Sequence, residues 1–223
     1  MTGPAAFAIG DLFRDDLSPV GVTPLAEGAV MLRGFARSAV AELVAAADRI
    51  AALSPFRHMV TPGGFSMSVA MTNCGRVGWV TDRSGYRYMP LDPKTGRPWP
   101  PFPAGFQSLA ERAAAAAGFA GFEPDACLIN RYEPGARLSL HRDEDERDLN
   151  APVVSISLGL PATFLFGGLS RKDRLSRIRL EGGDVVVWGG PARLVYHGVA
   201  PLAGAEDLLT GRSRINLTFR KAL

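Results

Sequence analysis

Apolar and polar positions alternate strictly between Arg214 and Arg220, with Ile215, Leu217 and Phe219 on one face. Side chains of a strand point to opposite faces with a period of two, so this segment is predicted to be a strand. Similar short segments separated by Gly and Pro fill the chain after residue 124. We predict strands at 126–132, 138–143, 153–158, 162–166, 177–180, 184–188, 193–199 and 214–220. Short strands at this spacing favour a β-sandwich or barrel of the jelly-roll kind.

The first half of the chain has a different pattern. Apolar residues recur at helical spacing after Ser38, which can cap a helix reaching about Ala52. Alanine propensity predicts a second helix over 105–117. Residues 26–34 are expected to form a strand, 59–88 strands and loops, and 92–105 a Pro/Gly connector. Residues 1–24 are expected to be an irregular arm. The fold class predicted is α+β, with two helices outside one jelly-roll domain.

Composition narrows the class of protein only a little. The chain has 223 residues, 47% of them apolar, which suits one domain with one sizeable core. Its net charge of +3 is compatible with a polyanionic partner. Cys74 and Cys127 are isolated and match neither a disulfide framework nor a zinc pattern. Without a signal peptide or an apolar run of about 18 residues, we expect a cytoplasmic protein that does not enter a membrane. We expect it to be a monomer.

His141 and Asp143 are two residues apart on a predicted strand, so their side chains point the same way. If a later strand brings His197 alongside, the three can occupy one face of an octahedral metal. That is the 2-His-1-carboxylate arrangement of non-haem Fe(II) oxygenases, whose opposite face stays open. Taken alone, however, a His-x-Asp triplet is more often an ordinary surface pair.

Polar residues share one face of two other predicted strands. Arg214, Asn216 and Arg220 alternate with the apolar residues of their segment, and Asn130 and Tyr132 share a face of theirs. One interpretation is an ordinary half-exposed sheet with its polar side outward. The other is that the polar faces point into the mouth of the barrel, where an arginine fork would bind a dicarboxylate.

Longer motifs favour the second interpretation. From about Ala26 to Arg220 the chain resembles the AlkB family of Fe(II)- and 2-oxoglutarate-dependent dioxygenases that repair alkylated nucleic acids. The resemblance is carried by SPFRHMVTPGG, SVAMTNCG, DACLINRY, LSLHRDEDE, SLGLPATFLFGG, GDVVVWGG, YHG and RINLTFR. It implies a double-stranded β-helix, which is a jelly roll, over 124–220. It also implies a nucleotide-recognition lid over 58–90 that covers the metal.

The resemblance also implies roles for the polar residues. His141, Asp143 and His197 would be the Fe(II) ligands. Arg214 and Arg220 would bind the two ends of 2-oxoglutarate, with Arg220 on the distal C5 carboxylate. The supporting hydrogen-bonding residues would be Asn130, Tyr132 and Asn216. His58 matches no ligand and is interpreted as structural.

In the lid segment, Trp79 and Tyr86 flank a Gly-containing turn. Such aromatic residues are more often packing residues, but they match the family's nucleotide-recognition lid, where stacking on bases tolerates any sequence. Met71 would be a flexible apolar contact nearby, and Asp145 and Arg171 match residues near the damaged base. Glu144 departs from the family pattern, because a bacterial relative carries lysine there. A carboxylate at this position would repel a phosphate of the nucleic-acid backbone.

The implied reaction couples oxidation of 2-oxoglutarate by O2, giving succinate and CO2, to hydroxylation of an N-linked methyl group. The hydroxymethyl group leaves as formaldehyde and restores a base such as adenine from 1-methyladenine or cytosine from 3-methylcytosine. The expected partner is alkylated DNA, single-stranded or with the base flipped, and RNA is a second candidate. Two alternatives remain at this stage: a non-catalytic jelly-roll binding protein, and an oxygenase acting on proteins or metabolites.

Overall fold

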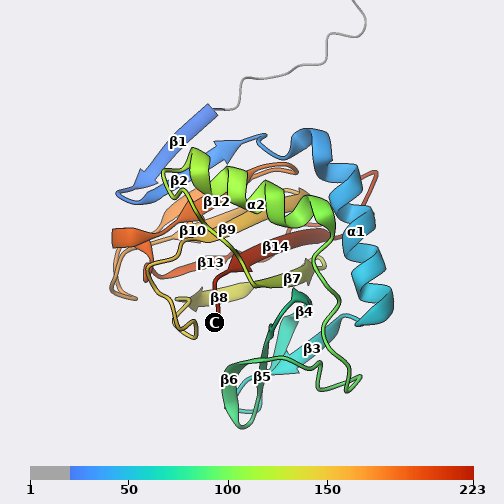
Figure 1. The fold of residues 1–223 in the computed structure, drawn as a ribbon. Helices are drawn as coiled ribbons and strands as arrows, with labels where there is room; N and C mark the ends of the chain where they lie inside the picture. The colour runs from blue at the N-terminus through green and yellow to red at the C-terminus, as the bar shows by residue number, and fades with distance from the viewer. Residues whose placement is uncertain (1–20) are drawn as a thin grey trace, which may run out of the picture.

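Two antiparallel sheets and a separate hairpin make up the computed structural model, which describes residues 21–223 (Figure 1). The large sheet has the strand order β1-β2-β12-β9-β14-β7-β4-β3. Its strands are β1 (Gly21–Ala26), β2 (Ala29–Arg33), β3 (Arg57–Val60), β4 (Ser66–Gly75), β7 (Ala126–Tyr132), β9 (Val153–Gly159), β12 (Val185–Trp188) and β14 (Arg214–Arg220). The chain therefore builds the jelly roll that was predicted.

The small sheet has the strand order β11-β10-β13-β8. Its strands are β8 (Leu138–His141), β10 (Ala162–Phe166), β11 (Ser176–Leu180) and β13 (His197–Val199). The hairpin consists of β5 (Gly78–Asp82) and β6 (Gly85–Met89), and it projects beyond β3 and β4 in Figure 1.

Strict alternation along the central strands produces two apolar cores. On β12, Val185 and Val187 pack into the core beneath the helices, whereas Val186 and Trp188 pack into the core between the sheets. This division follows from the period-two direction of strand side chains. Burying a side chain of this size contributes about 1.5–3 kcal/mol, so β12 is held from both faces.

Two helices cover the outer face of the large sheet, as predicted (Figure 1). α1 (Val40–Leu53) buries Leu43, Val44 and Ile50, and α2 (Ala104–Ala116) presents buried alanines that allow close approach. The predicted cap at Ser38 is wrong. Ser38 lies in the 3-10 turn η1 (Arg37–Ala39), and α1 begins after Ala39 with no side-chain cap. Between residues 21 and 223, no helix is long and apolar enough to cross a bilayer.

The N-terminal prediction was wrong in part. Residues 1–20 of the expected arm lie outside the described residues, but residues 21–24 belong to β1. Pro24 is tolerated because β1 is an edge strand, where a ladder donor can be missing. The single strand expected over 26–34 is interrupted by a turn at Gly28, which has φ 76°. A Cβ there would lie 2.4 Å from the Gly189 carbonyl oxygen, so the turn requires glycine.

Two strands near the candidate metal site are shorter than predicted. The strand expected over 138–143 ends at His141, so Asp143 lies in the loop that follows. The strand expected over 193–199 begins only at His197. The preceding residues form a 3-10 turn, η2 (Gly190–Ala192), and a buried anchor at Arg193.

Candidate active site

The polar faces of β7 and β14 point into the jelly roll. Arg214 pairs with Tyr132 and Asn216 with Asn130 in the antiparallel register, so all four side chains share one face. Arg214 is 1% exposed and Asn130 is 2% exposed, which excludes the interpretation of a polar side facing water. The opposite face of β14 carries Ile215, Leu217 and Phe219 into the core beneath the helices.

His141 and His197 lie directly opposite each other on β8 and β13. Their ring centroids are 4.4 Å apart, and the Nε2 atom of each ring lies 3.8 Å from a carboxylate oxygen of Asp143. One ligand atom from each of the three residues lies within 4.8 Å of the other two. Two imidazoles and a carboxylate suit Fe(II), so the three residues fit the predicted metal.

Backbone carbonyls orient both rings. The Nδ1 atom of His141 lies 2.9 Å from the Ser139 carbonyl oxygen, and that of His197 lies 3.0 Å from the Val195 carbonyl oxygen. A proton held on Nδ1 leaves the Nε2 lone pair free to bind metal. Burial, followed by the nearby His141, lowers the pKa of His197 to about 4. His197 is therefore neutral at physiological pH, which is the state that a ligand needs.

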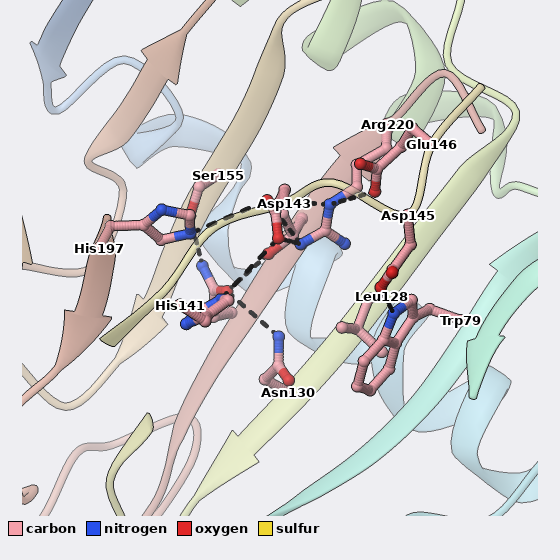
Figure 2. A network of polar contacts seen from close by, with 12 residues as sticks. Trp79, Leu128, Asn130, His141, Asp143, Asp145, Glu146, Ser155, His197 and Arg220 are labelled. Atoms are coloured by element: carbon pink, nitrogen blue, oxygen red, sulfur yellow. Dashed lines mark hydrogen bonds and ion pairs between the residues drawn. The ribbon is translucent and has the colours of Figure 1, made fainter. Parts of the chain in front are cut away.

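Asp143 is the centre of the polar network in Figure 2. Its two carboxylate oxygens accept hydrogen bonds from Nη2 of Arg220, each at 3.0 Å. Burial alone would raise the pKa of Asp143, but the Arg220 guanidinium, followed by the two histidines, holds it below its usual range. Asp143 is consequently an anion although it is 8% exposed.

A second shared acid, Glu146, extends this network. Arg193 donates from Nη2 to Glu146 at 2.9 Å, from Nη1 to the Asp143 carbonyl at 2.6 Å, and from Nε to the Ala151 carbonyl at 3.0 Å. Tyr88 of β6 donates its hydroxyl to Glu146 at 2.5 Å. Arg193 therefore fixes the loop that carries Asp143, and it lies only four residues before His197 on the chain.

The sequence-based prediction missed Tyr88, Glu146 and Arg193. Neither periodicity nor motif spacing identifies a buried ion pair between residues 47 positions apart. The available signal was the acidic run after His141 together with an arginine inside a predicted apolar strand. Such an arginine requires a buried partner, because an unpaired charge in a core is strongly unfavourable.

Arg214 differs from Arg220 in having no acidic partner. Its Nη2 donates to Ser157 at 3.0 Å and its guanidinium lies 5.0 Å from the Tyr132 ring, but Nε and Nη1 have no hydrogen-bond partner among the described residues. Oδ1 of Asn130 is also unsatisfied, whereas the Asn216 amide donates to Ser155 at 2.8 Å. A buried guanidinium with two unsatisfied donor nitrogens fits a carboxylate ligand.

The lid segment brings Trp79 and Tyr86 together. Their rings stack with centroids 5.6 Å apart and planes 16° apart, and Tyr86 is 49% exposed. Nε1 of Trp79 donates to Asp145 at 2.8 Å. Asp145 follows the candidate ligand Asp143 by two residues, so this hydrogen bond ties the aromatic pair to the metal loop (Figure 2). Burial raises the pKa of Asp145.

Two other residues, Met71 and Arg171, were predicted to contact substrate. Met71 is 1% exposed and belongs to the core between the sheets, where it pairs with Asn130 across β4 and β7. Its predicted role as a flexible apolar contact near the base stays a prediction. Arg171 lies on the loop after β10, with its guanidinium 5.9 Å from the Tyr196 ring. His58 is exposed and bonds to the Met67 carbonyl, outside the metal cluster.

Comparisons with known proteins decide the family. A sequence model of the 2OG-Fe(II) oxygenase superfamily matches residues 28–220. Over 212 residues the chain is 59% identical to the alpha-ketoglutarate-dependent dioxygenase AlkB of Escherichia coli K12, covering 95% of this chain and 97% of that protein. The chain belongs to the AlkB family of 2OG-Fe(II) oxygenases.

Two further relatives agree with this family. The AlkB homologue of Caulobacter vibrioides NA1000 is 46% identical over 187 residues, which cover 83% of this chain and 81% of that protein. The solved structure of OsALKBH1 superposes with a TM-score of 0.77 at 27% identity and covers 90% of this chain and all of that one. As an AlkB-family dioxygenase, the chain uses Fe(II), 2-oxoglutarate (alpha-ketoglutarate) and O2.

Proposed function

We propose that this AlkB-family enzyme oxidatively demethylates N-alkylated bases, such as 1-methyladenine and 3-methylcytosine, in DNA, with RNA as a second substrate. The products are the restored base, formaldehyde, succinate and CO2, so the reaction reverses alkylation damage directly. We further propose that it acts as a monomer in the cytoplasm. The relatives' printed names support nucleic acid as the substrate class, since they include a tRNA demethylase of Schizosaccharomyces pombe and the nucleic acid dioxygenase ALKBH1 of Mus musculus.

The observation that carries the proposal is the aromatic pair beside the metal loop. Trp79 and Tyr86 present a stacked, partly exposed surface, and Trp79 is bonded to Asp145. A base stacked on such a surface gains roughly 1–3 kcal/mol whatever its identity. Residues 58–90 therefore act as the lid that binds the extruded nucleotide, with Asp145 facing its polar edge.

The three facing ligands would hold Fe(II). Carbonyl-bound Nδ1 atoms keep the Nε2 lone pairs of His141 and His197 turned toward Asp143. Bound iron supplies activation of dioxygen, coupled to oxidative decarboxylation of 2-oxoglutarate. The chain's own residues orient the reactants, and Arg220 keeps Asp143 ionised.

The contacts of the two arginines favour exchanging the roles first predicted for them. Arg220 is already paired with Asp143 and lies 3.3 Å from Glu146, so it is committed to the metal end of the pocket. Arg214 has two free donors and no acidic partner among residues 21–223. Arg214, supported by Tyr132 and Asn130, is therefore the partner of the distal C5 carboxylate. Arg220 and Asn216 lie toward the other end of the cosubstrate.

Substrate-stimulated turnover tests this function. Succinate and formaldehyde are measured with purified enzyme, Fe(II), 2-oxoglutarate and an oligonucleotide carrying one 3-methylcytosine. We expect both products in equal amounts, and succinate formation well below that level with the unmethylated oligonucleotide. Formaldehyde release that does not depend on the methylated base would contradict the proposal. Parallel DNA and RNA oligonucleotides of one sequence determine the balance between the two substrates.

A further inference from the structure

The positive charge of the chain is concentrated in eight residues. Residues 170–177, called the cationic loop, run from the turn after β10 into the first two residues of β11 and contain Arg171, Lys172, Arg174 and Arg177 and the single acid Asp173. Their net charge is 4 − 1 = +3, and the rest of the chain has 25 − 4 = 21 basic and 22 − 1 = 21 acidic residues. The remainder is therefore neutral, and the whole formal charge of +3 lies on this loop.

The loop leaves the sheet beside the metal ligands. Phe166, the last residue of β10, pairs with His197 in the antiparallel register. Gly167 donates its backbone N–H to the Tyr196 carbonyl at 2.9 Å, and Tyr196 donates back to the Gly168 carbonyl at 2.9 Å. The cationic loop is thus anchored to the residue that precedes His197, which fixes it at the edge of the candidate active site.

The single acid of the loop does not neutralise its cations. Asp173 Oδ2 accepts a hydrogen bond from the Ser170 backbone N–H at 2.9 Å, so the carboxylate closes the turn of the loop. A Cβ on Gly168 would lie 2.2 Å from this oxygen, which shows how closely the turn is folded. Among the residues that the structure describes, Lys172, Arg174 and Arg177 form no ion pair, and all three are exposed.

Protection of a sheet edge explains only part of this charge. β11 is an edge strand, and charged side chains on such strands discourage pairing with another chain. That argument covers Arg177 and Arg179, which lie on β11 itself. It does not cover Lys172 and Arg174, which lie in the turn before the strand, where no ladder groups need protection.

We propose that the cationic loop binds the phosphodiester backbone of the nucleic acid outside the base pocket, with Lys172 and Arg174 as phosphate contacts. The inference rests on the proposed function and goes beyond it by assigning a role to Lys172 and Arg174, which are not among the residues predicted to contact the base. Arg171 and Arg142 both lie near the Tyr196 ring, at 5.9 and 5.6 Å, but Arg142 is paired with Glu144 at 2.6 Å. The unpaired charge therefore continues from the pocket along residues 170–177. The strand bound there is the target strand or, in a duplex, its complement.

The test compares two double variants that remove the same charge. Lys172→Ala/Arg174→Ala removes two cations of the loop, and Arg49→Ala/Arg112→Ala removes two exposed cations from the helices on the outer face of the large sheet. Affinity for a methylated 15-mer, single-stranded and duplex, is measured over a range of salt concentrations. The ratio of kcat/KM for the 15-mer to that for a methylated trinucleotide is measured in parallel.

For the loop variant we expect affinity for the 15-mer to fall about tenfold and the slope of log K against log salt to decrease by about 2, one for each lost phosphate contact. The kcat/KM ratio should fall with it, and the charge-preserving Lys172→Arg/Arg174→Lys should restore both. A loss confined to the duplex would assign the complementary strand, and a loss in both forms the target strand.

Equal effects in the two alanine variants, or none in either, would overturn the inference. If the wild type demethylates neither oligonucleotide, it is the proposed function that fails.

Discussion

The interior of the jelly roll and the β5–β6 hairpin differ in how far their polar side chains are exposed to water. Inside, Arg220, Arg193 and Glu146 are almost fully buried, and each has at least two polar partners. On the hairpin, the ion pair between Arg87 and Asp82 is 37% and 50% exposed, and Tyr86 is 49% exposed. Water competes for the ion pair of Arg87 and Asp82 and for almost none of the polar contacts inside.

The difference corresponds to two kinds of recognition. A metal and a small dicarboxylate require donor atoms at fixed positions, and buried ion pairs supply them because removing one partner is strongly unfavourable. Stacking on a base requires only an aromatic face in reach, which a half-exposed hairpin provides. Substitutions in the two regions should therefore differ both in size and in which ligand they affect.

The largest loss of activity is expected from substitution of Asp143, at the centre of the buried network. Asp143→Ala removes a metal ligand and should lower demethylation by more than about 100-fold, since even residues that only orient ligands are worth roughly 10–100-fold. The fold should persist because Arg220 keeps Glu146 as a partner. The control is Arg142→Ala, whose side chain pairs with the exposed Glu144 and should tolerate the change with a short substrate. Equal inactivation of the two variants would show that Asp143 matters no more for activity than Arg142 does.

The second largest effects are expected from the two buried arginines, whose substitution should weaken the binding of different ligands. Arg214→Ala should raise the KM for 2-oxoglutarate by at least about tenfold, because losing a hydrogen-bonded charge partner costs about 2–5 kcal/mol. Fe(II) affinity should change little. Arg220→Ala should instead weaken Fe(II) binding, since Arg220 holds Asp143. Anaerobic titration of each variant with Fe(II) and then 2-oxoglutarate, followed by visible absorption, distinguishes the two. The opposite pattern would restore Arg220 as the distal partner.

A smaller effect, limited to the affinity for nucleic acid, is expected from a substitution on the hairpin. Trp79→Ala should lower affinity for a methylated oligonucleotide by roughly 1–3 kcal/mol, the contribution of one stacked base. Binding of Fe(II) and 2-oxoglutarate should be nearly unchanged. Both ligands are titrated on one preparation whose folding is checked by circular dichroism. Comparable losses for both would make Trp79 a packing residue of the barrel.

Residues at the base of the β5–β6 hairpin should respond to substitution as the buried residues of the jelly roll do. Asp92 follows β6 and is 1% exposed, and it is bonded to Arg57 of β3 and to the Ser54 hydroxyl. Burial opposes its ionisation, but the hydrogen bonds from Arg57 and Ser54 outweigh burial and lower the pKa of Asp92 from 3.8 to about 2. The ionised form therefore stabilises the fold above pH 3.8, and this contribution is lost as the pH falls through about 2.

Asp92→Asn should consequently lower the free energy of unfolding at pH 7 by about 2 kcal/mol. The difference from wild type should shrink below pH 4 and be nearly absent at pH 2. Denaturant unfolding at a series of pH values measures it. Asp82→Asn, in the exposed pair of the same hairpin, is the matched control and should change stability little. A pH-independent loss in Asp92→Asn would mean that its packing, and not its charge, matters.

The sequence predicts strand bounds best where polar and apolar residues alternate or where the whole segment is apolar. The strands over 126–132 and 214–220 have the predicted bounds, and the alternation of polar and apolar residues along 214–220 is unbroken. β13 begins four residues later than predicted, since an apolar run does not reveal that Arg193 is needed as an anchor between two loops. The pairing of Met71 with Asn130 on the neighbouring strand likewise follows from tertiary packing and not from a local pattern.

Because β14 lies inside the large sheet, the sheet cannot be completed until this strand has been made. β14 lies between β9 and β7 in the large sheet, yet it is made after all the other strands described. Until it inserts, the nascent chain has a gap in the middle of its sheet and lacks Arg214 and Arg220. Because Ile215, Leu217 and Phe219 fill the core from the same strand, insertion completes the fold and the pocket in one event. A chain in which β14 has not yet inserted therefore has the three metal ligands but lacks both arginines proposed to bind 2-oxoglutarate.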